Sequence, residues 1–194
     1  MSGIYHFRQP LPAVDRREAL RYAGCRQETA DMAALLESCI DECADIFVPQ
    51  ICAIRLPIVH IDNGVMLGDI TIASHLLADT LAGCREALLF VATVGHGIDR
   101  LIARYSHLSP ARAVMLQALG TERIECLCDL FCADAAPITR RVSPGYGDIP
   151  LSLQTDICRL LDTPRRIGVT LSDSLLMAPT KSVTAIAGIS LEEA

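Results

Sequence analysis

The sequence predicts an α+β fold in which a twisted, largely antiparallel sheet is packed with helices. Three observations carry this prediction. Long segments place apolar residues at helical spacing, shorter segments are apolar over the length of a strand, and an Asn-Gly pair joins two of these strands. Helices and strands also follow one another without a regular strand–helix–strand repeat, which favours antiparallel pairing.

The first third of the chain is expected to be helical. Asp15 can cap a helix over 16–23, because its carboxylate can accept hydrogen bonds from the free N–H groups of the first turn. Apolar residues then recur every three or four positions over 32–47, shortly before a proline that ends this second helix. We therefore expect a helical region over residues 1–48 and an α+β core over 49–194, together forming one continuous domain.

A change of periodicity marks the strands. Segments 50–62 and 65–68 are expected to form a hairpin, since Asn63-Gly64 suits a turn in which both central residues have positive φ. The apolar run over 86–94 has the length of a strand. A Gly-His-Gly turn at 95–97 then leads into a helix and could bind an anion. It lacks the third glycine of a dinucleotide-binding loop and the lysine of a P-loop, so a tight turn is the favoured interpretation.

The longest helix is expected to begin at Ser109-Pro110, with the serine as cap and the proline in the first turn, and to run to about Ala133. Gly120 lies in its interior, where a glycine costs about 1 kcal/mol relative to alanine. Such a glycine indicates the close approach of another backbone or of a ligand, or a simple kink. The remaining expected elements are helices over 73–81 and 150–162 and strands over 138–143, 166–172 and 181–189.

The composition excludes several classes of function. Lys and Arg number 17 against 23 Asp and Glu, and this formal net charge of −6 argues against a binder of nucleic acid or anionic membranes. No apolar run reaches the roughly 18–20 residues of a membrane span, and no secretory signal is visible at the start of the sequence. We therefore expect a cytoplasmic protein.

Nine cysteines raise the question of a metal or redox site. Thiols stay reduced in the cytoplasm, and an odd number excludes complete internal pairing. Cys39 and Cys43 lie on the apolar stripe of their helix, so burial is the favoured interpretation. Cys128 and Cys132 share a face of the longest helix, but Cys126 points about 200° away from Cys128, which is awkward for a three-thiolate site. No metal is expected, and a cysteine-based metal or redox module is the alternative.

One loop stands out in the last third. It runs from Arg141 through Val-Ser-Pro-Gly-Tyr-Gly to Asp148, with φ fixed at the proline and permissive at both glycines. Few side chains cover such a loop, so its backbone groups can recognise the edge of a heterocycle. The guanidinium of Arg141 can hold a carboxylate, and the ring of Tyr146 can contact an apolar or cationic group. An ordinary Pro-Gly turn with a solvated arginine is the competing interpretation.

The segment Arg141-x-Ser143-Pro144-Gly145-Tyr146 resembles the Arg-Pro-x-Pro-Gly-Tyr signature in the activation (reactivation) domain of vitamin B12-dependent methionine synthase. Downstream, Leu-Ser-Asp-Ser, Met-x-Pro and Ser-Val segments within 171–183 are similar to that family's Leu-Thr-Glu-Ser, Met-x-Pro and Ser-Val segments. The stretch 120–125 resembles the family's helix with an inward glutamate, and 18–24 resembles short stand-alone relatives of the domain. The resemblance covers most of the chain.

The resemblance implies an activation-domain-like fold and an S-adenosylmethionine-binding protein that supports the reductive methylation of cob(II)alamin. Carried over by motif, the residues that contact S-adenosylmethionine are Arg141, Ser143, Gly145 and Tyr146. Glu125 matches a helix glutamate that faces the cationic end of the ligand, while Arg141 is expected to bind the carboxylate of the ligand. No catalytic side chain is expected, because methyl transfer to reduced cobalt moves no proton and needs mainly the positioning of two reactants.

Two departures from the family shape the expected role. Residues 185–188 lack the aromatic side chains that stand near this point in the synthases, where a tyrosine helps to hold the ligand. The sequence also lacks the Asp-x-His-x-x-Gly motif that ligates cobalamin in the synthase. The protein is therefore expected to act in trans, in a methionine synthase (methyltransferase) system of methionine biosynthesis. A corrinoid-binding methyltransferase would supply the cobalamin, and a flavodoxin-like or ferredoxin-like donor would supply the electron.

Two further interpretations stay open. The partner could be a different corrinoid protein, for example one of anaerobic one-carbon metabolism. Alternatively, the chain could be a docking module that binds a corrinoid partner and has lost S-adenosylmethionine binding, which the missing aromatic residues favour and the presence of Arg141 and Tyr146 opposes.

Overall fold

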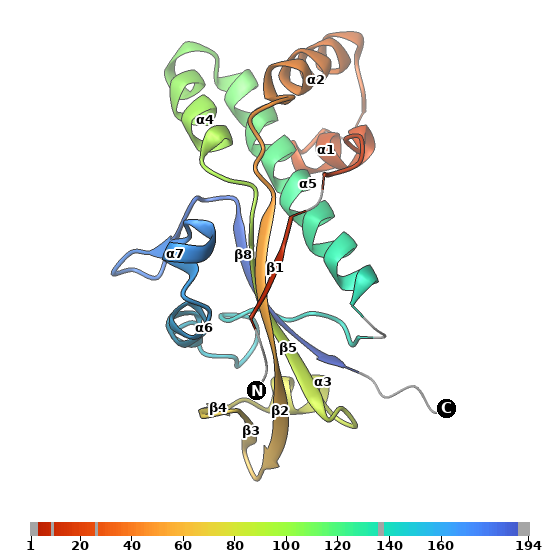
Figure 1. Cartoon of the computed structure of the whole chain (residues 1–194). Helices are drawn as coiled ribbons and strands as arrows, with labels where there is room; N and C mark the ends of the chain where they lie inside the picture. The colour runs from red at the N-terminus through yellow and green to blue at the C-terminus, as the bar shows by residue number, and fades with distance from the viewer. Residues whose placement is uncertain (1–3, 9, 26, 136–137, 190–194) are drawn as a thin grey trace.

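An antiparallel sheet runs through the molecule (Figure 1). The computed structural model describes residues 4–8, 10–25, 27–135 and 138–189. Its main strands follow the order β4-β3-β2-β5-β8, and β1 pairs with β2. All of these neighbours are antiparallel, which confirms the expected α+β class. The strands are β1 (Tyr5–Phe7), β2 (Gln50–Ile61), β3 (Gly64–Leu67), β4 (Ile70–Ala73), β5 (Glu86–Thr93) and β8 (Ser182–Ile189), with β6 (Thr170–Leu171) and β7 (Met177–Ala178) in a separate ribbon.

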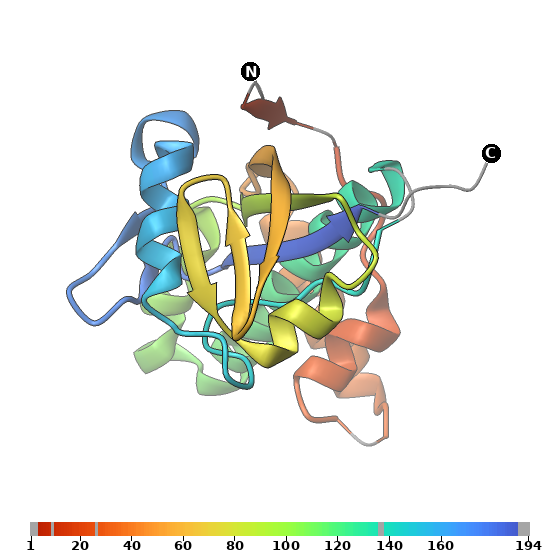
Figure 2. The same cartoon turned by 90° about the horizontal axis from the view of Figure 1, so that it is seen from below.

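Helices cover both faces of the sheet and form two hydrophobic layers. Side chains alternate along a strand, so Leu88 and Phe90 of β5 face one layer while Leu89 and Val91 face the other. Figure 2 shows α3 beside the β3–β4 hairpin of the second layer. The first layer contains α1 (Arg16–Tyr22), α2 (Ala30–Cys43), α4 (Gly97–Leu108) and α5 (Pro110–Asp134), and the second contains α3 (His75–Thr80), α6 (Leu153–Leu161) and α7 (Thr163–Ile167).

Local sequence signals explain where several elements begin and turn. The carboxylate of Asp15 caps α1 by accepting from the N–H groups of Arg17 and Glu18 over 3.0 and 3.1 Å. β2 and β3 form the expected hairpin, but Ile61 pairs with Gly64, so the two turn residues are Asp62 and Asn63. The expected turn with positive φ at both Asn63 and Gly64 is therefore wrong, because Asn63 does not have a positive φ. Proline stands in the first turn of α5, as the Ser-Pro pair predicts. The cap at Asp15, the hairpin and the position of the proline are therefore confirmed, whereas the side chain of Ser109 makes no capping hydrogen bond.

Three segments differ from the expectation because pairing partners decide the conformation of short stretches. Residues 5–7, for which the sequence predicts no specific helix or strand within the helical region over 1–48, form β1 against β2. The expected strand over 138–143 makes only two isolated bridges to β8. The expected strand over 166–172 begins as the end of α7, and a left-handed Gly168 with φ of +68° ends that helix before the two-residue β6.

The N-terminal elements pack directly on the rest of the chain. α1 and α2 contact α5, and β1 adds to the edge of β2. The boundary at residue 48 stays a prediction. Within the described residues, none of the helices combines the length and the apolar character needed to cross a membrane.

Candidate functional site

The loop singled out in the sequence leaves the outer edge of β8. Val142 and Ile186 exchange two backbone hydrogen bonds of 2.9 and 2.8 Å, and Ile138 bridges Ile189 further along the strand. Because this pairing is antiparallel, the chain after Val142 continues toward the first residue of β8. The loop over 143–149, which continues the predicted stretch 141–148, therefore begins beside the first half of β8.

Backbone hydrogen bonds hold this loop in one shape. The N–H of Gly145 donates to the C=O of Ile149 over 2.9 Å, and the N–H of Tyr146 donates to the C=O of Ser143 over 3.1 Å. Gly145 has a φ of +84°, which residues with a side chain rarely adopt. The side chain of Tyr146 is 55% exposed. A fixed turn thus presents a phenol ring to the outside.

Asp148 fastens the far end of the loop to the first turn of α3. Its carboxylate accepts hydrogen bonds from the N–H groups of His75 and Leu76, over 2.8 and 3.3 Å, and from the hydroxyl of Ser74. These bonds hold the pKa of Asp148 below its usual value, the bond from Ser74 contributing most. Gly147 lies so close to Leu76 that an added Cβ would come within 2.6 Å of its Cδ2. The loop is therefore attached to the second layer.

Replacing Asp148 by asparagine is expected to lower the melting temperature at neutral pH. The folded-state pKa lies below the unfolded value of about 3.9, so the ionised carboxylate stabilises the fold above about pH 4. This contribution is lost as the pH falls through the folded-state pKa. Thermal unfolding should show that the difference in melting temperature between the parent and Asp148→Asn is smaller at pH 3 than at pH 7. Asp173→Asn, at an exposed position, is the control. A gap that does not change with pH would contradict the anchoring role.

A second group of predicted site residues meets on α5. Nη2 of Arg141 donates to Oε2 of Glu125, and Nη1 donates to Oδ1 of Asp129. Burial alone lowers the pKa of Arg141. The hydrogen bond to Asp129 and the negative charges of both carboxylates outweigh it and raise that pKa above its ordinary value. The guanidinium is therefore charged, and this cluster of one cation and two anions carries a net charge of −1.

The structure brings the predicted site residues together in two groups. Glu125 and Arg141, which come from distant segments, are in direct contact. Ser143, Gly145 and Tyr146 form the turn that begins two residues after Arg141. The guanidinium that was expected to hold a ligand carboxylate already holds two carboxylates of the chain. Two of its five N–H donors are thus used by Asp129 and Glu125.

Sequence reasoning missed two acidic residues of this region. Asp129 stands four residues after Glu125, a spacing that places two side chains on one helix face and could have indicated the pair. Asp148 closes the loop motif, but its partners on α3 are 72 to 74 residues away in the sequence. Glu125 and Asp129 also line a hollow of about 400 Å³ between α1 and α5, which the ring of Tyr22 borders.

The stretch that lacks the family's aromatic residues is packed inside the sheet. Ala185, Ile186 and Ala187 are fully buried. A Cβ on Gly188 would come within 2.6 Å of the sulfur of Cys84. The outward backbone groups of Ile186 and Gly188 are already bonded to Val142 and Thr139. This part of β8 therefore offers a ligand no bulky side chain.

The Gly-His-Gly turn before α4 is explained by packing. A Cβ on Gly97 would come within 2.3 Å of Cγ2 and 2.6 Å of the backbone oxygen of Ile46. Gly95 has a φ of +84° and lies against Val48. Both glycines thus allow the chain after α2 to approach, which agrees with the favoured interpretation of a tight turn.

Six of the nine cysteines are buried, and the other three are partly exposed. Cys39 and Cys43 belong to the hydrophobic layer on the α5 side, as expected. Burial raises the pKa of Cys43 and of Cys52 to about 12, and it also raises the pKa of Cys128 on α5. Such thiols stay protonated at neutral pH, whereas metal ligation needs the thiolate. Across the described ranges, no group of three or more His, Cys, Asp or Glu side chains is arranged to hold a metal ion.

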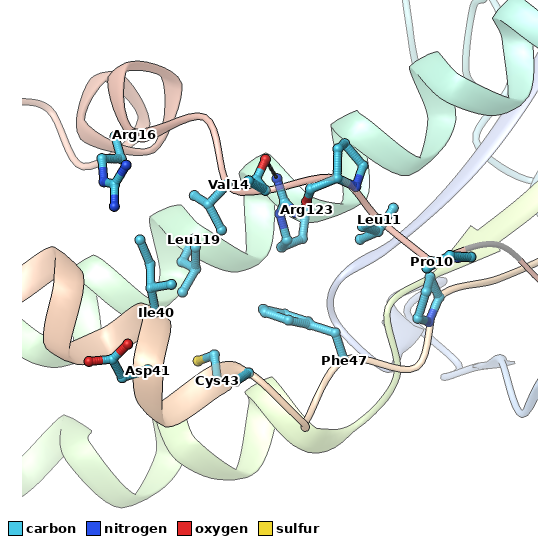
Figure 3. A pocket seen from close by; sticks show the side chains of 14 residues that line it. Pro10, Leu11, Val14, Arg16, Ile40, Asp41, Cys43, Phe47, Leu119 and Arg123 are labelled. Carbon is cyan, nitrogen blue, oxygen red and sulfur yellow. Dashed lines mark hydrogen bonds between the residues drawn. The ribbon is translucent and has the colours of Figure 1, made fainter.

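A separate hollow of about 460 Å³ lies between α2 and the segment that leads into α1 (Figure 3). Apolar side chains such as Leu11, Ile40 and Phe47 form much of its wall, and Arg16 and Asp41 stand at its borders. It shares no lining residue with the predicted site loop.

A buried ion pair fixes the segment beside this hollow. Glu122 and Arg123 of α5 are 5% and 4% exposed and bind each other. Nη1 of Arg123 donates to the C=O of Pro12 over 2.6 Å, and Oε1 of Glu122 accepts from the N–H of Asp15 over 3.1 Å. The pair therefore holds the start of α1 against α5.

No family model and no curated protein matches the sequence. The structure is similar to the crystal structure of the MetH reactivation domain bound to AdoHcy. That likeness has a TM-score of 0.74 at 13% sequence identity and covers 99% of this chain and 80% of that chain. At this identity the likeness establishes the fold, and it confirms the activation-domain-like fold expected from the loop motif.

Proposed function

We propose, from the reactivation-domain fold that this chain adopts, that it binds S-adenosylmethionine and supports the reductive methylation of cob(II)alamin on a separate corrinoid methyltransferase such as methionine synthase. The observation that carries the proposal is the contact between Glu125 and Arg141 at the start of the loop over 143–149. Two parts of the sequence that resemble the activation domain independently meet there, in a fold shared with a domain that was crystallised with AdoHcy.

The chemistry of the cluster suits a cationic ligand. S-adenosylmethionine carries a sulfonium and an ammonium group, and the net negative charge of Arg141, Glu125 and Asp129 favours cations beside it. Arg141 donates a hydrogen bond to Oε2 of Glu125, so the other carboxylate oxygen of Glu125 can face the ligand. We assign Glu125 to the cationic end, held in orientation by Arg141.

The loop supplies the remaining recognition. Ser143, Gly145 and Tyr146 form a turn whose shape is fixed by internal hydrogen bonds before any ligand arrives, which reduces the entropy lost on binding. Backbone groups of this turn and of the adjacent β8 edge can bind the polar edge of an adenine, and the exposed ring of Tyr146 can lie against its face.

S-adenosylmethionine, when bound, supplies the methyl group, and a partner's corrinoid supplies the nucleophilic cobalt. The part of this chain is to hold the sulfonium in place and to exclude competing orientations. The electron would come from a flavodoxin-like or ferredoxin-like donor. The same chemistry serves another corrinoid protein, which is therefore an equivalent partner class.

Calorimetric titration with S-adenosylmethionine, alone and with a cobalamin-loaded corrinoid methyltransferase, tests the proposal. Binding is expected in both cases, and with a low-potential reductant the absorbance of cob(II)alamin should convert to that of methylcobalamin only when the chain is present. Absence of binding in both titrations would overturn it.

A second candidate is a docking module without S-adenosylmethionine. It is favoured by the occupation of Arg141 by two internal carboxylates and by the small, buried residues 185–188. Complex formation with the corrinoid protein in the absence of any S-adenosylmethionine binding would select this candidate.

A further inference from the structure

The sequence contains one lysine, Lys181, among its 17 basic residues. It stands just before β8, and its Nζ donates to the hydroxyl of Thr121 on α5 over 2.9 Å. Nothing in the described part of the chain forms an ion pair with this ammonium group; Asp99, the acid that acts on it, is bound to the N–H and hydroxyl of Thr180. Lys181 is thus a half-buried cation whose ammonium group has N–H donors that are not used by the hydrogen bond to Thr121.

Gly120 makes room for the stem of this lysine. A Cβ at Gly120 would come within 3.0 Å of both Cγ and Cε of Lys181 and within 3.2 Å of Ile98. The glycine that interrupts α5 therefore allows the close approach that its position in the sequence indicated. Packing against α5 fixes the aliphatic stem and leaves the ammonium group at a defined place.

The ammonium group borders a hollow of about 490 Å³ between α1, α4 and α5. Thr121, Gln117 and Ser106 give this hollow polar groups, and Tyr22 gives it an aromatic wall. Tyr22 also lines the hollow that contains Glu125 and Asp129, so the two hollows share this residue in their walls.

The spacing along α5 relates Lys181 to the acidic cluster. Thr121, Glu125 and Asp129 follow each other at intervals of four residues and share one face of the helix, with about 6 Å between successive positions. Lys181 binds the first position, and Arg141 binds the second and third. The loop after Val142 also runs toward the start of β8, where Lys181 lies.

We propose that Lys181 binds the carboxylate of S-adenosylmethionine while Glu125 binds its ammonium group. The inference rests on the proposed function and refines it. The ammonium and carboxylate groups of an α-amino acid are attached to the same carbon. With a hydrogen bond of about 2.9 Å on each side, they can bridge two protein groups that lie one helical turn apart, as the groups at positions 121 and 125 do. A third carboxylate at Arg141 would be repelled by the two already there.

The electrostatics of Lys181 support this assignment. Burial lowers the pKa of its ammonium group, which means that the charged form lacks full compensation in the ligand-free protein. A ligand carboxylate would supply the missing partner.

The decarboxylated analogue of S-adenosylmethionine isolates the contact, because it keeps the sulfonium and ammonium groups. The parent should bind the analogue about 10- to 100-fold more weakly than S-adenosylmethionine, the range of a hydrogen bond between charged groups. Lys181→Met keeps an aliphatic stem against Gly120 and should bind both compounds with equal affinity. Arg165→Gln, which removes an exposed charge on α7, should keep the discrimination of the parent.

A label on the single lysine gives a readout that needs no variant. With 13C at Cε, Lys181 contributes one side-chain signal to the NMR spectrum, and this signal should move on addition of S-adenosylmethionine and much less on addition of the analogue. Two results would overturn the inference and leave the proposed function standing. One is a Lys181→Met variant that prefers S-adenosylmethionine over the analogue as strongly as the parent does. The other is a parent that binds both compounds with equal affinity. A parent that binds neither compound would overturn both.

Discussion

Replacing Arg141 by alanine is expected to weaken the binding of S-adenosylmethionine by about 1.5–3 kcal/mol, the scale of the charged hydrogen bond between Glu125 and the ligand, which is lost when Glu125 is no longer held in orientation. The guanidinium holds Glu125 and Asp129 side by side, and its removal frees two like charges that then separate. Because Lys181 is assigned to the carboxylate, Arg141→Ala should weaken the binding of the decarboxylated analogue by the same factor. Calorimetric titration measures both affinities.

The neighbouring arginine provides a matched control. Arg140 is exposed and carries the same charge, so Arg140→Ala changes the net charge equally without touching the cluster on α5. If Arg141→Ala binds S-adenosylmethionine as tightly as the parent does, Arg141 is not part of the binding site. If the variant loses affinity for S-adenosylmethionine and not for the analogue, Arg141 and not Lys181 binds the carboxylate of the ligand.

Replacing Arg123 by leucine is expected to lower the free energy of unfolding by about 3–5 kcal/mol, the cost of leaving one member of a buried ion pair without its partner. The carboxylate of Glu122 would then stay buried, and within the described residues the N–H of Asp15 would be its remaining hydrogen-bond donor. The carbonyl of Pro12 would also lose its 2.6 Å bond. Urea denaturation measures the loss.

Two further proteins make this measurement specific. Arg100→Leu removes an exposed arginine of α4 and should change the free energy of unfolding little. A double variant, Glu122→Gln with Arg123→Met, removes both charges and should be more stable than Arg123→Leu alone, because no charge is left unpaired. A loss below about 1 kcal/mol in Arg123→Leu would show that water reaches the pair.

The elements that the sequence predicted correctly are those with a local physical cause. The cap at Asp15, the β2–β3 hairpin, the apolar run of β5 and the proline in the first turn of α5 each depend on a few neighbouring residues. The short strand β1 and the bridges of 138–142 depend on partners far away in the chain. No local pattern contains that information, which is why these segments were assigned differently.

The candidate site divides in the same way. The residues from Arg141 to Tyr146 could be found because they form one short motif, and Glu125 could be found by resemblance. The ion pairs that join Arg141 to α5 could not, since 12 and 16 residues separate the partners and the helix must first be placed beside β8. Lys181 carried no motif at all, although its uniqueness in the sequence and the glycine opposite it were both visible.

The attachment of Asp148 to α3 has a mechanical consequence. α5 belongs to one layer of the molecule and α3 to the other, and the edge of β8 lies between them. A small molecule held by α5 on one side and by the tethered loop on the other would act as a removable cross-link between the layers. Binding of the small molecule would then make the β8 edge of the sheet more rigid, and its release would make that edge more flexible. A docking protein could sense this difference in stiffness.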